Sequence, residues 1–185
     1  MPVALCGDMK KAFLQVHVRE KDRDVLRFHW IKNQDQNQIV TYRFTRSIWG
    51  LNQSPFILGG TVEEHLTLYE NIHPEVVSEI RNSLYVDDMI SGGFNETEVR
   101  TLKQLAIKIF AEAKFTLHKW HSNISSLESD INCDNEQSQT YAKSQLGVKQ
   151  NETKILGLVW DKIADTISVA FPIEKCEETK ADIAW

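Results

Sequence analysis

The chain has 185 residues with a formal net charge of −5, 42% hydrophobic residues and 25% charged residues. This size and near-average composition indicate one globular domain or part of one, and they exclude a disordered chain, a collagen-like chain and a coiled-coil rod. No apolar run approaches the roughly 18–20 residues that a membrane-spanning helix needs. The first residues contain no basic segment before an apolar core, so a secretory signal is not expected, and we expect no membrane partner.

Three cysteines, Cys6, Cys133 and Cys176, are an odd number and include no C-x-x-C pair. We therefore expect neither a disulfide framework nor a cysteine-rich zinc site, and the pattern favours a reducing compartment. The acidic balance argues against a tail dedicated to nucleic acid, although it leaves room for a local basic groove.

A strand and a hairpin are the first elements that the pattern predicts. Residues 3–7 are apolar and predict a short buried strand that leads directly to Asp8. Residues 25–30 and 39–44 alternate apolar and polar side chains on either side of a polar loop, which predicts an antiparallel hairpin.

A helix follows this hairpin. Ser54 before Pro55 predicts the N-cap and the first residue of a helix of about four turns. Gly59 and Gly60 lie inside it and each costs about 1 kcal/mol relative to alanine. We therefore expect close backbone packing at these two positions.

A second, shorter helix is predicted from Pro74, and a tight hairpin follows within residues 83–93. Asn95 with Glu98 three residues later predicts the capped start of a long amphipathic helix. Residues 115–120 predict a further strand.

The last part of the chain is less regular. Residues 122–152 are polar and weakly patterned, which predicts a surface insertion or linker. Residues 154–160 and 166–171 predict the two strands of a closing hairpin that turns at residues 161–165.

Three carboxylates are the residues most suited to chemistry. Asp8 lies at a strand end, and Asp87 and Asp88 lie at a predicted hairpin tip. Carboxylates that converge in one sheet repel one another unless a cation lies between them, and Mg²⁺ prefers such oxygen ligands. Two adjacent aspartates are more often ordinary turn residues, so the spacing of the surrounding motifs has to decide between the two interpretations.

That ordered set of motifs resembles the palm of reverse transcriptases, and most closely that of the BEL/Pao class of LTR retrotransposons. The resemblance covers nearly the whole chain and is carried by residues 8–15, 44–46 with 49–56, the Tyr-Val-Asp-Asp box at 85–88, 115–123 and 155–161. It implies an α+β polymerase palm with an antiparallel sheet, helices packed on one face, the carboxylates on the other, and a closing hairpin.

The resemblance also implies the roles of individual residues. Asp8, Asp87 and Asp88 would hold two Mg²⁺ ions, with Mn²⁺ as the alternative metal, and Lys119 would protonate the leaving pyrophosphate. The remaining positions that it implicates are Phe13, Trp49, Gly50 and Gln53 in the nucleotide pocket, and Ser54, Tyr85, Leu156, Gly157 and Leu158 along the template and primer.

Three of these positions have plain structural alternatives. Phe13 lies where the family places the aromatic ring that blocks a ribose 2′-hydroxyl, but a core aromatic would look the same. Ser54 suits a helix cap, and Lys119 suits a solvated surface lysine.

The resemblance divides the chain into four parts. Residues 1–121 are expected to form the palm core, 122–152 an insertion or linker, 153–171 a primer-grip-like hairpin, and 172–185 the start of a truncated segment. Family members carry a fingers subdomain, with cations for the triphosphate, before the first motif. Because seven residues precede Asp8, we expect little polymerase activity from this chain alone.

The expected function is RNA-directed DNA polymerisation, a nucleotidyl transfer to a primer 3′-end. Expected partners are an RNA or DNA template with its primer, deoxynucleoside triphosphates and the rest of a Gag-Pol-like polyprotein. The expected location is intracellular, in a cytoplasmic virus-like particle or else the nucleus. The alternative is an inactive palm remnant with at most weak nucleic-acid binding. An aspartic protease is disfavoured because the sequence contains neither Asp-Thr-Gly nor Asp-Ser-Gly.

Overall fold

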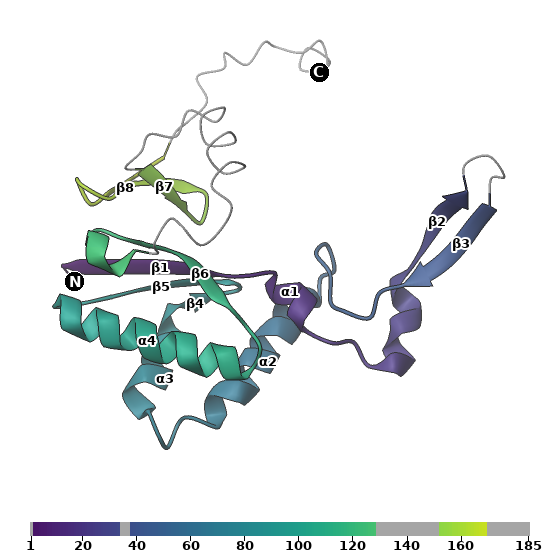
Figure 1. Cartoon of the computed structure of the whole chain (residues 1–185), viewed down its shortest axis with the longest axis horizontal. Helices are drawn as coiled ribbons and strands as arrows, with labels where there is room; N and C mark the ends of the chain where they lie inside the picture. The colour runs from purple at the N-terminus through teal and green to yellow at the C-terminus, as the bar shows by residue number, and fades with distance from the viewer. Residues whose placement is uncertain (1, 34–37, 129–151, 170–185) are drawn as a thin grey trace, which may run out of the picture. The chain divides into compact units, whose positions relative to one another are not determined.

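Helices and antiparallel strands alternate in the computed structural model, which describes residues 2–33, 38–128 and 152–169 (Figure 1). The chain divides into two compact units, residues 1–134 and 135–185, and each is described by itself. The elements of the first unit are β1 (Val3–Met9), α1 (Ala12–Gln15), the 3-10 helix η1 (Glu20–Leu26), β2 (Arg27–Asn33), β3 (Gln38–Arg43), α2 (Ser54–Thr67), α3 (Pro74–Ser83), β4 (Leu84–Tyr85), β5 (Asp88–Gly93), α4 (Glu96–Glu112), β6 (Leu117–Ser122) and the 3-10 helix η2 (Ser125–Leu127). This mixture confirms the predicted α+β class.

The main sheet of the first unit has the strand order β4-β5-β1-β6, and β1 pairs antiparallel with both of its neighbours. Alternate residues of a strand face opposite sides of the sheet. Leu5 and Met9 of β1 are buried on the face of the sheet that contributes to the core. Asp8, an adjacent residue of the same strand, faces the other side.

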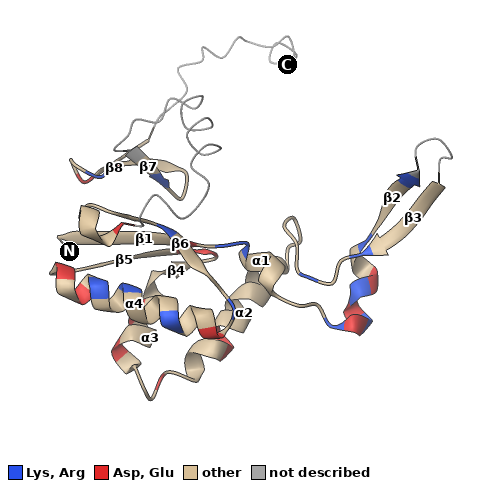
Figure 2. Cartoon of the chain, viewed as in Figure 1, with Lys and Arg blue, Asp and Glu red and all other residues tan. Residues whose placement is uncertain are grey.

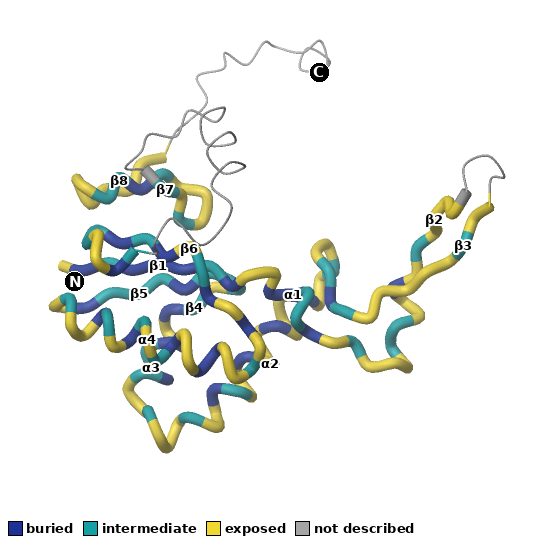
Figure 3. Tube along the Cα trace, in the orientation of Figure 1, coloured by how far each residue is buried: buried dark blue, intermediate teal, exposed yellow. Residues whose placement is uncertain are grey.

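The helices cover the apolar face of this sheet (Figures 1 and 3). Their buried side chains join those of the strands in one hydrophobic cluster, and fully burying an aliphatic or aromatic side chain contributes about 1.5–3 kcal/mol. The helical members of the cluster include Leu58, Val62 and Leu66 of α2, Val77 and Ile80 of α3, and Val99, Ala106, Ile109 and Phe110 of α4.

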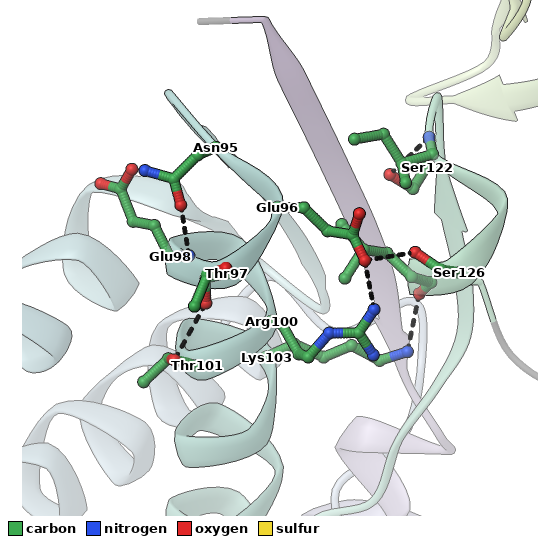
Figure 4. Close-up of polar contacts among 11 residues, drawn as sticks. Asn95, Glu96, Thr97, Glu98, Arg100, Thr101, Lys103, Ser122 and Ser126 are labelled. Carbon is green, nitrogen blue, oxygen red and sulfur yellow. Dashed lines mark hydrogen bonds and ion pairs between the residues drawn. The ribbon is translucent and has the colours of Figure 1, made fainter.

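Helix α4 begins as the sequence predicts. The side chain of Asn95 accepts a hydrogen bond from the backbone N–H of Glu98 (Figure 4). The carboxylate of Glu98 accepts one from the N–H of Phe94. The first contact satisfies a backbone donor that a helix start otherwise leaves unpaired, and the second ties the residue before the N-cap to the first turn. Acidic and basic residues are then mixed along the helix (Figure 2).

The first unit extends beyond the predicted boundary at residue 121. Ser126 donates a hydrogen bond of 2.7 Å to Glu96, which also pairs with Arg100, and Lys103 donates one of 2.7 Å to the carbonyl of Leu127 (Figure 4). Leu127 is only 1% exposed and belongs to the main core cluster. The start of the predicted insertion is therefore packed structure.

Strands β2 and β3 form the predicted antiparallel hairpin. The ring of Phe28 packs against that of Tyr42 on β3, with ring centroids 5.8 Å apart. It also packs against the ring of Phe44, just after β3, with centroids 4.7 Å apart. The described residues of these two strands include lysine and arginine but no acidic residue (Figure 2). The two arginines of the hairpin are paired with acids of η1, because Arg27 and Arg43 both lie 2.8 Å from the carboxylate of Asp24 and Arg43 also contacts Glu20.

Two predictions about α2 are wrong. Gln53, not Ser54, occupies the N-cap position, because the Ser54 hydroxyl points inward and donates to the carbonyl of Ile48. A Cβ added at Gly59 or Gly60 would meet nothing within 4 Å, so close packing does not explain these glycines within the described residues.

The second unit contains three antiparallel strands, β7 (Glu152–Ile155), β8 (Leu158–Asp161) and β9 (Thr166–Ser168). The sequence predicts one strand over residues 154–160, but the chain turns at Leu156 and Gly157, which both have positive φ. The predicted turn at residues 161–165 is present between β8 and β9.

Several predictions lie outside the described residues. They concern Cys133, Cys176, most of the 122–152 insertion and the segment 172–185.

Candidate active site

The register of the main sheet brings two of the three candidate carboxylates together. Asp8 of β1 lies directly opposite Asp88 of β5. Residues directly opposite each other in an antiparallel pair have their side chains on the same face, with Cβ atoms about 4.5–5.5 Å apart. The two carboxylates therefore share one small region on the face of the sheet away from the helices.

Asp87 joins this region through the turn that connects β4 to β5. Tyr85 pairs with Asp88, so the turn has only two residues, Val86 and Asp87. The carbonyl of Asp87 accepts a hydrogen bond of 2.8 Å from the N–H of Met9, which fixes the turn beside the end of β1. Val86 has φ of 58°, a strained conformation for a β-branched residue that is often retained near functional sites.

A bulge in β6 brings two adjacent basic side chains to Asp8. Asp8 pairs with His118, and the register between β1 and β6 shifts just beyond this pair, where Lys119 adopts φ of 50°. The Nζ atom of Lys119 donates a 2.9 Å hydrogen bond to Oδ2 of Asp8, and Nε2 of His118 lies 3.1 Å from the same oxygen. Successive residues of a regular strand face opposite sides, so the bulge explains how both reach one carboxylate.

Gly7 makes the close approach of β1 and β6 feasible at this bulge. A Cβ added at Gly7 would lie 2.7 Å from the ring of Trp120, which is buried on the core side of the sheet. A glycine next to Asp8 is therefore required by the packing of the neighbouring tryptophan.

The environment raises the pKa of Asp87 and that of Asp88. Burial is the largest cause for both residues, and the charge of Asp8 adds to it, together with that of Asp87 in the case of Asp88. The charge of Lys119 opposes these effects at both carboxyls, and the N–H of Asp87 itself opposes them at Asp87. The site thus holds more negative charge than its own cation neutralises.

Within the part of the chain that the structure describes, no group of three or more His, Cys, Asp or Glu side chains is arranged to hold a metal ion. Asp8 instead contacts Lys119 and His118. Mg²⁺ is usually held by one or two carboxylates together with substrate phosphates, not by a complete protein cage. The oxygen ligands on facing strands suit a magnesium site that substrate completes.

Phe13 and Trp49, both expected in the nucleotide pocket, lie in contact. Their rings meet edge to face with centroids 6.1 Å apart. Phe13 is 6% exposed and part of the core, whereas Trp49 is 60% exposed. The structure therefore makes Phe13 a core residue whose edge supports an exposed tryptophan.

The other expected contact residues of the first unit differ in access. Gly50, with φ of 84°, and Gln53 are exposed in the turn before α2. Ser54 is buried, and its hydroxyl also accepts a hydrogen bond from Ser47. Tyr85 is 61% exposed next to the carboxylates.

Leu156, Gly157 and Leu158 lie at the β7–β8 turn of the second unit, and all three are exposed. The turn has the backbone conformation of a two-residue hairpin connection.

Sequence reasoning missed His118. Its position next to the candidate lysine was visible in the sequence, but a single histidine in a strand carries no signal of its own. The pairing of His118 with Asp8 emerges only from the register of β1 and β6.

No family model and no curated protein matches this chain. Among the described residues, no helix combines the length and the apolar character needed to cross a membrane.

Proposed function

We propose that this chain is the palm of a reverse transcriptase of the BEL/Pao type, an RNA-directed DNA polymerase that adds deoxynucleotides to a primer 3′-end. The observation that carries the proposal is the pairing of Asp8 with Asp88 on adjacent strands, with Asp87 in the turn beside them. The ordered sequence motifs around these three residues support the same assignment.

The three carboxylates are proposed to hold two Mg²⁺ ions, or Mn²⁺ in their place. When bound, these ions would activate the primer 3′-hydroxyl and stabilise the charge on the leaving pyrophosphate. Asp8 and Asp88 supply ligands from two paired strands, and Asp87 supplies one from the turn. Lys119 is proposed to donate a proton to the leaving group, as a positioned general acid.

The proposed partners are a primed RNA or DNA template, deoxynucleoside triphosphates and the remainder of a Gag-Pol-like polyprotein. Phe13, Trp49, Gly50 and Gln53 are proposed to contact the nucleotide. The residues proposed along template and primer are Tyr85, Leu156, Gly157 and Leu158. The expected contact by Ser54 is not proposed, because Ser54 is buried and its hydroxyl bonds to Ile48 and Ser47. The proposed location is a cytoplasmic virus-like particle.

Equilibrium binding of dTTP with and without Mn²⁺ tests this function on the 185-residue chain. We expect Mn²⁺ to promote dTTP binding in the wild type and in Asp22→Asn, a control that removes an acid of η1. The Asp8→Asn and Asp88→Asn variants should lose this effect. Equal dTTP binding by all four proteins would contradict the proposal.

An inactive palm remnant is the second candidate. The observation that favours it is the absence, among the described residues, of a preformed three-ligand group. It predicts that Mn²⁺ leaves the affinity for dTTP unchanged in the wild type, so the same experiment separates the two candidates.

A further inference from the structure

Lys119 and His118 both lie against one carboxylate oxygen of Asp8. The Nζ atom of Lys119 lies 2.9 Å from Oδ2, the same oxygen that faces Nε2 of His118 at 3.1 Å. A carboxylate oxygen already in contact with two basic groups has to give up at least one of them before it ligates a metal ion.

The two basic residues differ in how easily they can leave. The side chain of His118 is 16% exposed and in register with Asp8, whereas that of Lys119 is 52% exposed and on the bulge. A lysine has a flexible stem and a compact charge, so it can move into solvent without disturbing the sheet. Of the two groups, Lys119 is therefore the one that can leave Asp8 with less disturbance of the sheet.

We propose that Lys119 is a built-in counter-cation of Asp8 that exchanges with the divalent metal ion. Without metal, Lys119 neutralises Asp8 beside Asp88. When the metal binds, Lys119 leaves Asp8 and becomes available to substrate phosphates. The proposal rests on the proposed function, because it takes Asp8 as a metal ligand, and it couples the availability of the lysine to metal loading.

The exchange predicts that Lys119→Met strengthens metal binding and lowers the stability of the metal-free fold. Mn²⁺ affinity, measured by electron paramagnetic resonance of the full chain, should rise about tenfold, within the range usual for coupled sites. The urea midpoint of the metal-free chain should fall. Lys114→Met is a matched control, because Lys114 is also exposed and also has positive φ, at 66°. It should change neither quantity.

A double-mutant cycle with Asp8→Asn separates exchange at Asp8 from a general effect of the lysine charge. If Lys119 competes for Asp8, Lys119→Met changes neither Mn²⁺ affinity nor the metal-free urea midpoint once Asp8 is asparagine. An undiminished effect of Lys119→Met in the Asp8→Asn background would overturn the exchange. Unchanged or weaker Mn²⁺ binding by Lys119→Met would also overturn it.

These measurements are independent of dTTP binding. If Mn²⁺ binds at Asp8 and promotes dTTP binding but Lys119→Met has no effect, only the exchange fails. If Mn²⁺ shows no Asp8-dependent binding at all, the proposed function and the exchange fail together.

Discussion

Gly7 and the ring of Trp120 lie so close that an added Cβ at Gly7 would be 2.7 Å from the nearest ring carbon. Gly7 precedes Asp8 on β1, and Trp120 follows Lys119 on β6. The contact therefore controls the spacing of the two strands at the point where Lys119 and His118 reach Asp8.

Gly7→Ala should lower the free energy of unfolding by about 1–3 kcal/mol, the usual cost of overpacking a core. Urea denaturation measures this change. Gly60→Ala is the matched control, because a Cβ there meets nothing within 4 Å. It should be neutral or stabilise α2 by up to about 1 kcal/mol. Equal destabilisation by both substitutions would show that the contact with Trp120 is unimportant.

Leu127→Ala should lower the free energy of unfolding by about 2–5 kcal/mol, because it leaves a cavity in the main core. Leu68→Ala is a suitable comparison, since Leu68 is exposed and its truncation should have a small effect. Thermal or urea unfolding measures both. If Leu127→Ala behaved like Leu68→Ala, residues after 121 would be a linker, as the sequence alone predicts.

The raised pKa values of Asp87 and Asp88 predict that the contribution of these two groups to metal-free stability falls as the pH rises from about 4 towards neutrality. A raised folded-state pKa means that the folded chain binds more protons than the unfolded chain in this range. The stabilising contribution of each carboxyl is complete below its pKa in the unfolded chain, and it is lost as the pH rises through its pKa in the folded chain. Urea midpoints of the wild type should therefore decline more steeply with pH than those of Asp87→Asn, Asp88→Asn. If the urea midpoints of the two proteins declined equally with pH, burial and repulsion would not raise the pKa values of Asp87 and Asp88.

Phe13→Ala should increase the ratio of ribonucleotide to deoxynucleotide incorporation in an enzyme reconstituted with fingers and thumb. The substitution removes the ring next to Trp49 and therefore any clash with a 2′-hydroxyl. Phe115→Ala is a matched control, because Phe115 is also a buried core phenylalanine and also meets another ring edge to face. The same ratio in both variants would leave Phe13 with a core role alone.

The sequence predicts the scaffold of the site well, because its elements follow strong local patterns. Asp8, at the end of an apolar strand, and Asp87-Asp88, between β-forming residues, were placed correctly at a strand end and a hairpin tip. The start of α4 was predicted because Asn95 and Glu98 satisfy specific backbone donors.

The features that the sequence did not reveal depend on tertiary packing. The bulge at Lys119 is set by the pairing of β6 with β1, and no local pattern marks it. Leu127 and Ile124 are two apolar residues in a polar stretch, so the composition of the stretch hid their packing against the core. The turn at Leu156 and Gly157 interrupts an apolar run that otherwise suits one continuous strand.

Localised binding of Mn²⁺ tests most directly whether Asp8, Asp87 and Asp88 form one metal site. Paramagnetic broadening of backbone amide signals, followed by nuclear magnetic resonance as Mn²⁺ is added, reports which residues lie near the ion. We predict that the amides of residues 7–9 and 86–89 broaden first in the wild type and that Asp88→Asn weakens this effect. Broadening centred on other acidic segments, such as η1 or the start of α4, with no change in Asp88→Asn, would contradict a metal site at these three carboxylates.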